Sequence, residues 1–204
     1  MRVSLFYDAV NVALFAPSGG SRRLRRSFVR SLDPQPGARV LELGCGTGQV
    51  TAELVRAGTD VVAVDRLPEM LDAARRRAPT ATFIEGDVID AEAGSSFDHV
   101  ALAFVLHSFD TDGRVRLLRR AANALTLGGT VGVLDWRLPG GARRARAWRW
   151  FLRALEPSAT VDEVLDGRLQ ADIRAANLAV VAQRPLAGGR CEFLVLANGN
   201  PAAP

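Results

Sequence analysis

Three glycines at alternate positions, Gly44, Gly46 and Gly48, follow the apolar run 40–43 and precede the amphipathic run 50–57. A strand, a glycine turn and a helix in this order let the backbone approach a ligand closely and aim amide N–H groups at it. The spacing differs from the G-x-G-x-x-G fingerprint of dinucleotide-binding folds. Because a glycine triplet by itself usually means a structural turn, its neighbours must decide whether a ligand binds here.

Two carboxylates flank this turn. Glu42 lies within the end of the first apolar run and predicts a pocket that prefers a cationic group. Asp65 follows Gly48 by 17 residues, at the end of the second apolar run 61–65. A carboxylate at the carboxyl end of a neighbouring strand can accept hydrogen bonds from both hydroxyls of a ribose. The alternative for Asp65 is a cap on the helix that begins near Pro68.

Five short segments along the chain carry a family resemblance. They are Glu-Leu-Gly-Cys-Gly-Thr-Gly (42–48), Val-Asp-Arg (64–66), Glu-Gly-Asp-Val (85–88), Phe-Asp-His-Val (97–100) and Leu-Thr-Leu-Gly-Gly (125–129). In this order they resemble the class I S-adenosylmethionine-dependent methyltransferases. The opening Phe6-Tyr7-Asp8 is similar to the small-molecule branch that includes the ubiquinone and menaquinone C-methyltransferases. The resemblance covers nearly the whole chain and is much more specific for fold and cofactor than for substrate.

The resemblance implies a role for each residue around a bound S-adenosylmethionine. The residues expected at the cofactor are Glu42, Gly44, Cys45, Gly46 and Gly48 at the amino-acid tail, Asp65 at the ribose, Arg66, Asp87 and Val88 at the adenine, and Ala103 beside the sulfonium. Two of these have simpler alternatives. Arg66 is otherwise a surface residue in a turn, and Asp87 otherwise forms an Asx turn, a common arrangement for aspartate after glycine.

Three further residues are candidates for contact with the methyl acceptor. His107 follows the fourth expected strand and would suit a general base toward a phenol, a hydroxyl or an acidic carbon. Its alternative is a hydrogen bond to loop backbone. Asp135 would orient the acceptor or, alternatively, cap a helix or pair with an arginine. Tyr7 would stack near the cofactor or donate to the acceptor, unless it is simply buried, and His99 is expected to be a packing residue.

Methyl transfer asks little of side chains, because holding the nucleophile in line with the methyl carbon supplies most of the advantage. The sequence therefore predicts an S-adenosylmethionine-dependent methyltransferase with a small apolar or aromatic acceptor, methylated at oxygen or carbon. Two alternatives stay open. One is a non-catalytic S-adenosylmethionine-binding regulator or partner subunit, and the other is an N-methyltransferase for a phospholipid or amine. The glycine spacing disfavours a nicotinamide-dependent oxidoreductase.

Composition bears on the number of domains, the location of the protein and its partners. The 204 residues are 48% hydrophobic, which favours one domain with a substantial core. No apolar run has the length of a bilayer, and no signal peptide is recognised, so a cytoplasmic protein is expected. All 26 basic residues are arginine, and the net charge of +4 does not by itself predict nucleic-acid binding. Cys45 and Cys191 lie in separate elements without metal-ligand spacing, so neither a metal nor a disulfide is predicted.

From residue 39 the chain alternates strand and helix, which predicts an α/β fold with a largely parallel sheet. By resemblance the fold is a Rossmann-like sheet of seven strands with helices on both faces and a C-terminal antiparallel hairpin. The predicted strands span 39–43, 60–65, 81–85, 97–104, 130–136, 178–184 and 190–197. The predicted helices span 8–15, 21–32, 47–57, 68–77, 111–125, 142–155 and 161–176. One domain, 1–204, would comprise a helical lid (1–38), a cofactor-binding core (39–136) and a substrate-side part (137–204).

Two helices are rich in arginine. In 21–32 the arginines are expected to face solvent, either on an ordinary outer helix or on a lid; they are Arg22, Arg23, Arg25, Arg26 and Arg30. In 142–155 one face carries Trp148, Phe151, Leu152 and Leu155, while Trp150 points away from it. This second helix is expected to pack on the sheet. Its alternatives are a cap over a hydrophobic, lipid-like acceptor and a weak contact with a membrane surface. The oligomeric state is not predicted.

Overall fold

The computed structural model describes residues 8, 14–16, 19–155 and 159–199. Tyr7 and most of the helix expected over 8–15 lie outside these residues, so their predicted roles stay predictions.

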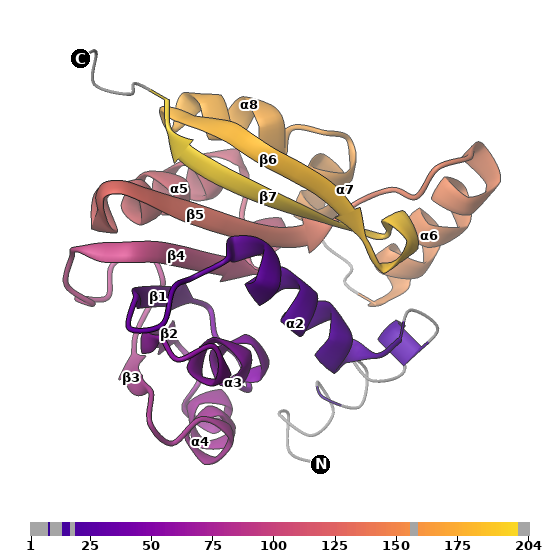
Figure 1. The fold of residues 1–204 in the computed structure, drawn as a ribbon. Coiled ribbons are helices and arrows are strands. Elements are labelled where there is room, and N and C mark those ends of the chain that lie inside the picture. The colour runs from indigo at the N-terminus through magenta and orange to yellow at the C-terminus, as the bar shows by residue number, and fades with distance from the viewer. Residues whose placement is uncertain (1–7, 9–13, 17–18, 156–158, 200–204) are drawn as a thin grey trace.

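In the described part of the chain, seven strands form one sheet in the order β3-β2-β1-β4-β5-β7-β6 (Figure 1). The strands are β1 (Arg39–Leu43), β2 (Asp60–Asp65), β3 (Thr82–Glu85), β4 (Phe97–Ala103), β5 (Leu125–Trp136), β6 (Leu178–Leu186) and β7 (Cys191–Asn198). Neighbours from β3 to β5 pair in parallel, whereas β7 runs antiparallel to both β5 and β6. This confirms the predicted Rossmann-like sheet with a closing hairpin.

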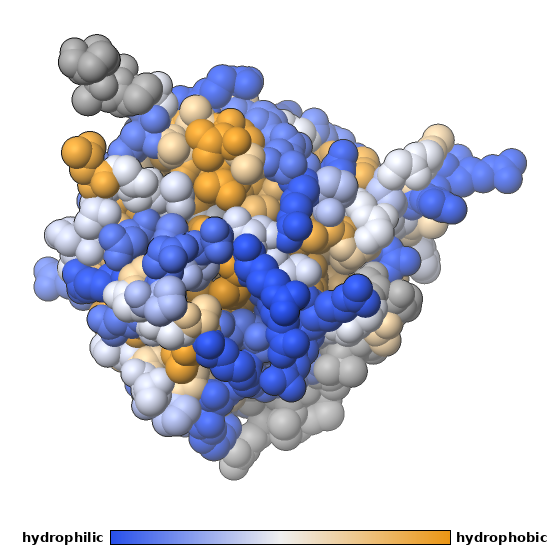
Figure 2. Space-filling model, in the orientation of Figure 1, coloured by the Kyte–Doolittle hydropathy of each residue, from blue (hydrophilic) through white to orange (hydrophobic). Residues whose placement is uncertain are grey.

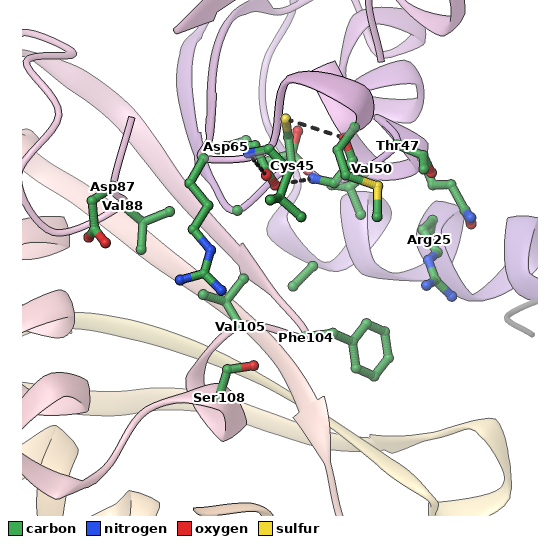
Figure 3. A pocket seen from close by; sticks show the side chains of 18 of the residues that line it. Arg25, Cys45, Thr47, Val50, Asp65, Asp87, Val88, Phe104, Val105 and Ser108 are labelled. Atoms are coloured by element: carbon green, nitrogen blue, oxygen red, sulfur yellow. Dashed lines mark hydrogen bonds between the residues drawn. The ribbon is translucent and has the colours of Figure 1, made fainter. Parts of the chain in front are cut away.

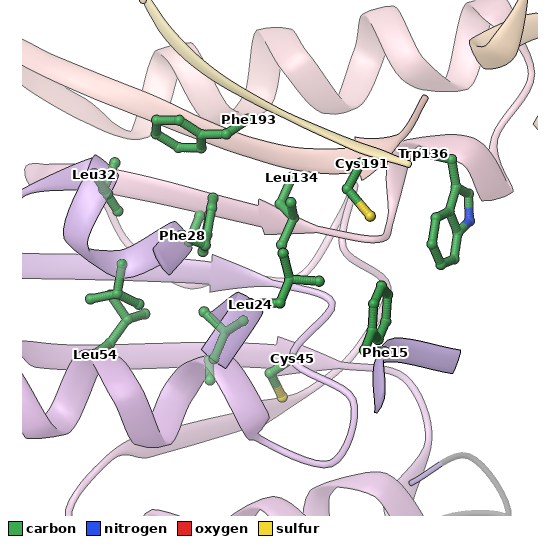
Figure 4. Close-up of a cluster of buried hydrophobic side chains, with 14 of the residues drawn as sticks. Phe15, Leu24, Phe28, Leu32, Cys45, Leu54, Leu134, Trp136, Cys191 and Phe193 are labelled. Atoms are coloured by element: carbon green, nitrogen blue, oxygen red, sulfur yellow. The ribbon is translucent and has the colours of Figure 1, made fainter. Parts of the chain in front are cut away.

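Helices cover both faces of the sheet, as expected when parallel strands are joined by crossover helices. They are α2 (Ser21–Leu32), α3 (Gln49–Arg56), α4 (Pro68–Arg77), α5 (Thr111–Ala124), α6 (Ala142–Leu155), α7 (Ala159–Leu165) and α8 (Leu169–Ala175). Phe28 and Leu54 belong to the core under α2 and α3 (Figure 4). Leu117 and Ile173 belong to a second core under α5 and α8. None of the described helices is both long and apolar enough to cross a bilayer.

Most element boundaries agree with the prediction to within two residues, and two elements differ more. The single helix expected over 161–176 is two helices, because Gly167 adopts φ +84° between α7 and α8, a conformation that ends a helix. Strand β5 begins at Leu125 rather than at 130, since Leu125 pairs with Phe97 of β4. The early part of β5 contains Gly128 and Gly129, a pair that is typical of a turn in the sequence, and it exposes Leu127 almost fully, at 99%.

The arginines of α2 do not share one environment, which corrects the expected outer face. Arg25 is only 3% exposed. It lies three and four residues before Phe28 and Val29, so it sits on the helix face that packs inward. Its guanidinium carbon lies 5.0 Å from the ring centroids of both Phe15 and Phe104, and these cation–π contacts allow a charge to be buried there.

Candidate functional site

A cavity of about 340 Å³ lies at the carboxyl ends of β1, β2 and β4 (Figure 3). It is lined by all the predicted cofactor residues except Gly48; among them are Glu42, Gly46, Asp65, Asp87 and Ala103. Asp87 and Arg25 lie toward opposite ends of the cavity. The ends of parallel strands meet at one edge of a sheet, which is why residues far apart in sequence gather here.

Two glycines of the turn are needed for different reasons, Gly46 for access to the backbone and Gly48 for close packing. Gly46 adopts φ +52° and lines the cavity, where a Cβ atom would meet no protein atom within 4 Å. Gly48 adopts φ +75°, and a Cβ there would lie 2.8 Å from the backbone of Ala74 in α4. Gly48 therefore serves the packing of the turn against α4, whereas Gly46 presents bare backbone to a ligand.

Asp65 connects the end of β2 to the glycine turn. Its Oδ2 accepts a hydrogen bond from the Gly46 N–H at 2.7 Å, and its Oδ1 accepts one from the Leu67 N–H at 3.0 Å. No side chain caps α4. Each carboxylate oxygen keeps a second lone pair, so the two backbone bonds orient Asp65 at the cavity and leave it able to accept from a ligand.

Glu42 is 2% exposed, and its Oε2 accepts a hydrogen bond from Thr51 Oγ1 at 2.6 Å. Burial raises the pKa of this carboxyl to about 8, although the Thr51 hydrogen bond opposes the rise. Burial also raises the pKa of the neighbouring Cys45 thiol, which disfavours a nucleophilic thiolate. A cationic ligand group beside Glu42 would favour its ionised form.

Asp87 forms the Asx turn that was the simpler alternative, since its Oδ1 accepts from the Ile89 N–H at 2.8 Å. It nevertheless lines the cavity together with Val88 and Arg66. A turn that holds the carboxylate at the cavity is compatible with a ligand contact through the same side chain.

An aromatic wall closes the other side of the cavity. Phe104 follows β4 with φ +58°, uncommon for a residue other than glycine, and its N–H donates to the Leu134 carbonyl at 2.7 Å. Its ring centroid lies 4.5 Å from that of Trp136. Arg25 and Ser108 also line the cavity and were not among the predicted site residues. The position of Arg25 within the apolar stripe of α2 was the available signal.

His107 and Asp135, proposed separately from the sequence, form a buried pair. The Nδ1 atom of His107 lies 2.7 Å from Asp135 Oδ1, and the His107 backbone N–H donates to Oδ2. The pair lies behind the residues that line the cavity, next to Trp136, whose ring centroid is 5.9 Å from that of His107. Asp135 is thus a partner of His107, whereas the alternatives for Asp135 were a helix cap or an arginine. His99 packs in β4 with its Nδ1 2.9 Å from Thr130 Oγ1.

A polar network attaches Asp8 to the glycine turn. Its carboxylate accepts from Thr47 Oγ1 at 2.7 Å, from Gln49 Nε2 at 2.8 Å and from Arg77 Nη2 at 2.6 Å. Burial acts to raise the pKa of Asp8, but the hydrogen bonds, that of Arg77 first, outweigh burial and lower it. Arg77 also donates to the Thr47 carbonyl. Asp8 is thereby held at the glycine turn.

No group of three or more metal-ligating side chains occurs within the described residues. What this part of the chain offers instead is a concave site with three carboxyl groups (Glu42, Asp65 and Asp87), bare backbone and an aromatic wall.

Comparisons with known proteins identify the family. A model described as a methyltransferase domain matches residues 40–129. A demethylmenaquinone methyltransferase from Clavibacter sepedonicus is 30% identical over 210 aligned positions, which cover 92% of this chain and 83% of that protein.

Solved structures share the fold. A TehB-like SAM-dependent methyltransferase from Corynebacterium glutamicum matches with a TM-score of 0.69 at 22% identity, covering 96% of this chain and 97% of that one. The O-methyltransferase NcsB1 of neocarzinostatin biosynthesis, in complex with S-adenosylmethionine and 2-hydroxy-5-methyl naphthoic acid, matches with a TM-score of 0.61 at 23% identity, covering 79% and 49%. The chain thus belongs to the class I S-adenosylmethionine-dependent methyltransferases and resembles their quinone-methylating members.

Proposed function

We propose that this enzyme transfers the methyl group of S-adenosylmethionine to a small aromatic or apolar acceptor, at oxygen or carbon, by in-line displacement. The observation that carries the proposal is one cavity that holds Asp65 and Glu42 at one side and the Phe104 ring at the other. Carboxylates and bare backbone suit a polar, cationic donor, whereas an aromatic wall suits a flat apolar acceptor.

The donor would be held by residues whose geometry fits it. Asp65 would accept from the ribose hydroxyls, and Asp87 with Val88 would address the adenine. Glu42 and the turn from Gly44 to Gly48 would take the amino-acid tail. Arg66 would flank the adenine and Ala103 the sulfonium. When bound, the sulfonium supplies an activated methyl group; what remains for the protein is alignment and exclusion of water.

His107, which lies directly before the cavity-lining Ser108, is proposed as the general base for an acceptor with an acidic O–H; this role requires the acceptor to come within hydrogen-bond distance of its ring. The Asp135 carboxylate beside Nδ1 favours the tautomer with the proton on that atom, which makes Nε2 the basic nitrogen. Such a base would serve oxygen methylation of a phenol. The names of the similar proteins include both an O-methyltransferase and demethylmenaquinone methyltransferases, so both reactions belong in the test.

The test has two stages. Titration with S-adenosylhomocysteine should raise the melting temperature by mass action, whereas NAD should leave it unchanged. Labelled S-adenosylmethionine is then incubated with hydroxynaphthoic acids, demethylated quinones, amines and phospholipids. Transfer to one of the first two classes supports the proposal. Binding without transfer to any acceptor favours the non-catalytic alternative, and transfer only to amines or phospholipids favours N-methylation.

We also propose that the protein is cytoplasmic, uses no metal and folds as a single domain over 1–204, as expected from the sequence.

A further inference from the structure

Helix α6 has two unlike faces. Trp148 and Leu152 are buried against the body of the protein. Trp150 is 73% exposed and lies on the opposite side. Arg146 and Arg143 lie four and seven residues before Trp150, so they share its side of the helix. The outer face of α6 is therefore a tryptophan flanked by arginines.

The arginines of α6 have two different roles. Arg149 and Arg153 form ion pairs with Asp162 of α7, and Arg149 also pairs with Asp166. Arg143, Arg144 and Arg146 are all exposed, and none of them forms an ion pair with another described residue. Figure 2 shows hydrophilic side chains projecting where α6 stands out from the body in Figure 1. The first half of α6 thus presents three positive charges to solvent.

A series of ring contacts leads from this helix to the cavity wall. Phe151 is 39% exposed, and its ring stacks on Trp148 at 5.3 Å. Trp148 meets Trp136 at 5.9 Å, and Trp136 meets Phe104 at 4.5 Å. Phe104 lines the cavity. A series of packed rings, buried at Trp148 and Trp136, therefore connects α6 to the cavity wall.

We propose that α6 binds the surface of an anionic lipid bilayer, with Trp150 and Phe151 among the head groups and acyl ends, and with Arg143, Arg144 and Arg146 at the phosphates. Exposed tryptophan beside arginine is the composition that suits a membrane interface, because the indole ring is apolar with one polar edge. The inference rests on the proposed function for its purpose, since an apolar acceptor could then reach the cavity from the bilayer.

The positive charge of this face favours an anionic lipid surface over a second copy of the chain as its partner. A two-fold interface through this face would place the same three arginines against each other, and like charges in contact oppose association. An anionic lipid surface instead attracts each arginine, by about fivefold in partitioning. A partner that is both negative and apolar fits the whole face.

The experiment measures binding to vesicles without donor or acceptor. Mixed phosphatidylcholine–phosphatidylglycerol vesicles are compared with pure phosphatidylcholine by flotation and by tryptophan fluorescence. Trp136 and Trp148 are buried, so a blue shift and protection from acrylamide on lipid binding report on Trp150. We expect binding to the anionic vesicles that weakens with salt.

Matched variants locate the contact. Arg143→Gln with Arg146→Gln should weaken binding roughly 25-fold. Trp150→Ser should weaken it and abolish the blue shift. Two control variants should bind as the wild type does. Arg76→Gln with Arg116→Gln removes the same charge from exposed sites on α4 and α5, and Leu127→Ser removes an exposed apolar side chain from β5.

Four results would overturn the inference. They are absence of binding, equal binding to neutral vesicles, equal loss in the charge control, and protection of Trp150 without lipid together with a doubled mass in light scattering. The last would show an interface between copies. Because the assay involves no reaction, failure here leaves the proposed methyl transfer standing, and failure of transfer leaves this binding result unaffected.

Discussion

At the scale of single residues, Asp65 does two things with one carboxylate: it fixes the Gly46 amide and faces the cavity. Asp65→Asn should weaken S-adenosylhomocysteine affinity about 10- to 100-fold, because hydrogen bonds to a charged acceptor are worth about 1.5–3 kcal/mol. Calorimetric titration measures the change. Asp60→Asn, at the exposed opposite end of the same strand, is the control and should bind normally. Unchanged affinity for Asp65→Asn would remove the ribose assignment.

Glu42 should make stability depend on pH. Below about pH 4.5 this carboxyl is protonated in both the folded and the unfolded chain. As the pH rises toward 8, the unfolded chain ionises while folded Glu42 stays protonated, so the free energy of unfolding falls, by about 5 kcal/mol at most. Above about pH 8 the loss levels off. Urea denaturation at several pH values should show this fall in the wild type and a smaller one in Glu42→Gln; parallel curves would contradict the assigned burial effect.

His107 should matter for turnover and not for donor binding. With an acceptor identified by the labelled-donor assay, His107→Gln should lower kcat about 100-fold or more, as expected for loss of a general base. Its Kd for S-adenosylhomocysteine should stay that of the wild type, because His107 does not line the cavity. His99→Gln, which changes a histidine within β4, serves as the comparison. A normal kcat for His107→Gln would assign the His107–Asp135 pair to structure alone.

At the scale of elements, the contact of Asp8 and Arg77 with Thr47 joins the N-terminal segment, α4 and the glycine turn. Arg77→Met should cost about 1 kcal/mol, since these groups are partly exposed and solvent screens them. Hydrogen exchange of the turn amides should then be roughly fivefold faster.

The matched variant for this contact is Arg76→Met, at the exposed neighbouring position. Its exchange rates should equal those of the wild type. Because the pKa of Asp8 is lowered, the contact is present at neutral pH and is lost as the pH falls through that lowered value. Identical exchange in Arg77→Met and Arg76→Met would show that the contact does not hold the turn.

Most elements could be predicted because their signals are local. Strands β1 and β2 are short apolar runs bounded by polar residues, and α4 begins at a proline suited to a first helical turn. The exceptions have local causes of a different kind. Gly167 interrupts a continuous helical pattern, and Gly128 and Gly129 within β5 are typical of a turn.

At the scale of the whole molecule, the sequence by itself determined the sheet, the glycine turn and the strand-end residues at the cavity, because strand ends in a parallel sheet converge whatever packs around them. Only the tertiary structure decided that Arg25 enters the cavity, that His107 meets Asp135 and that rings connect Phe104 to α6. These contacts join segments far apart in the chain. Their geometry depends on how helices cross the sheet, and the periodicity of one segment carries no information about that crossing.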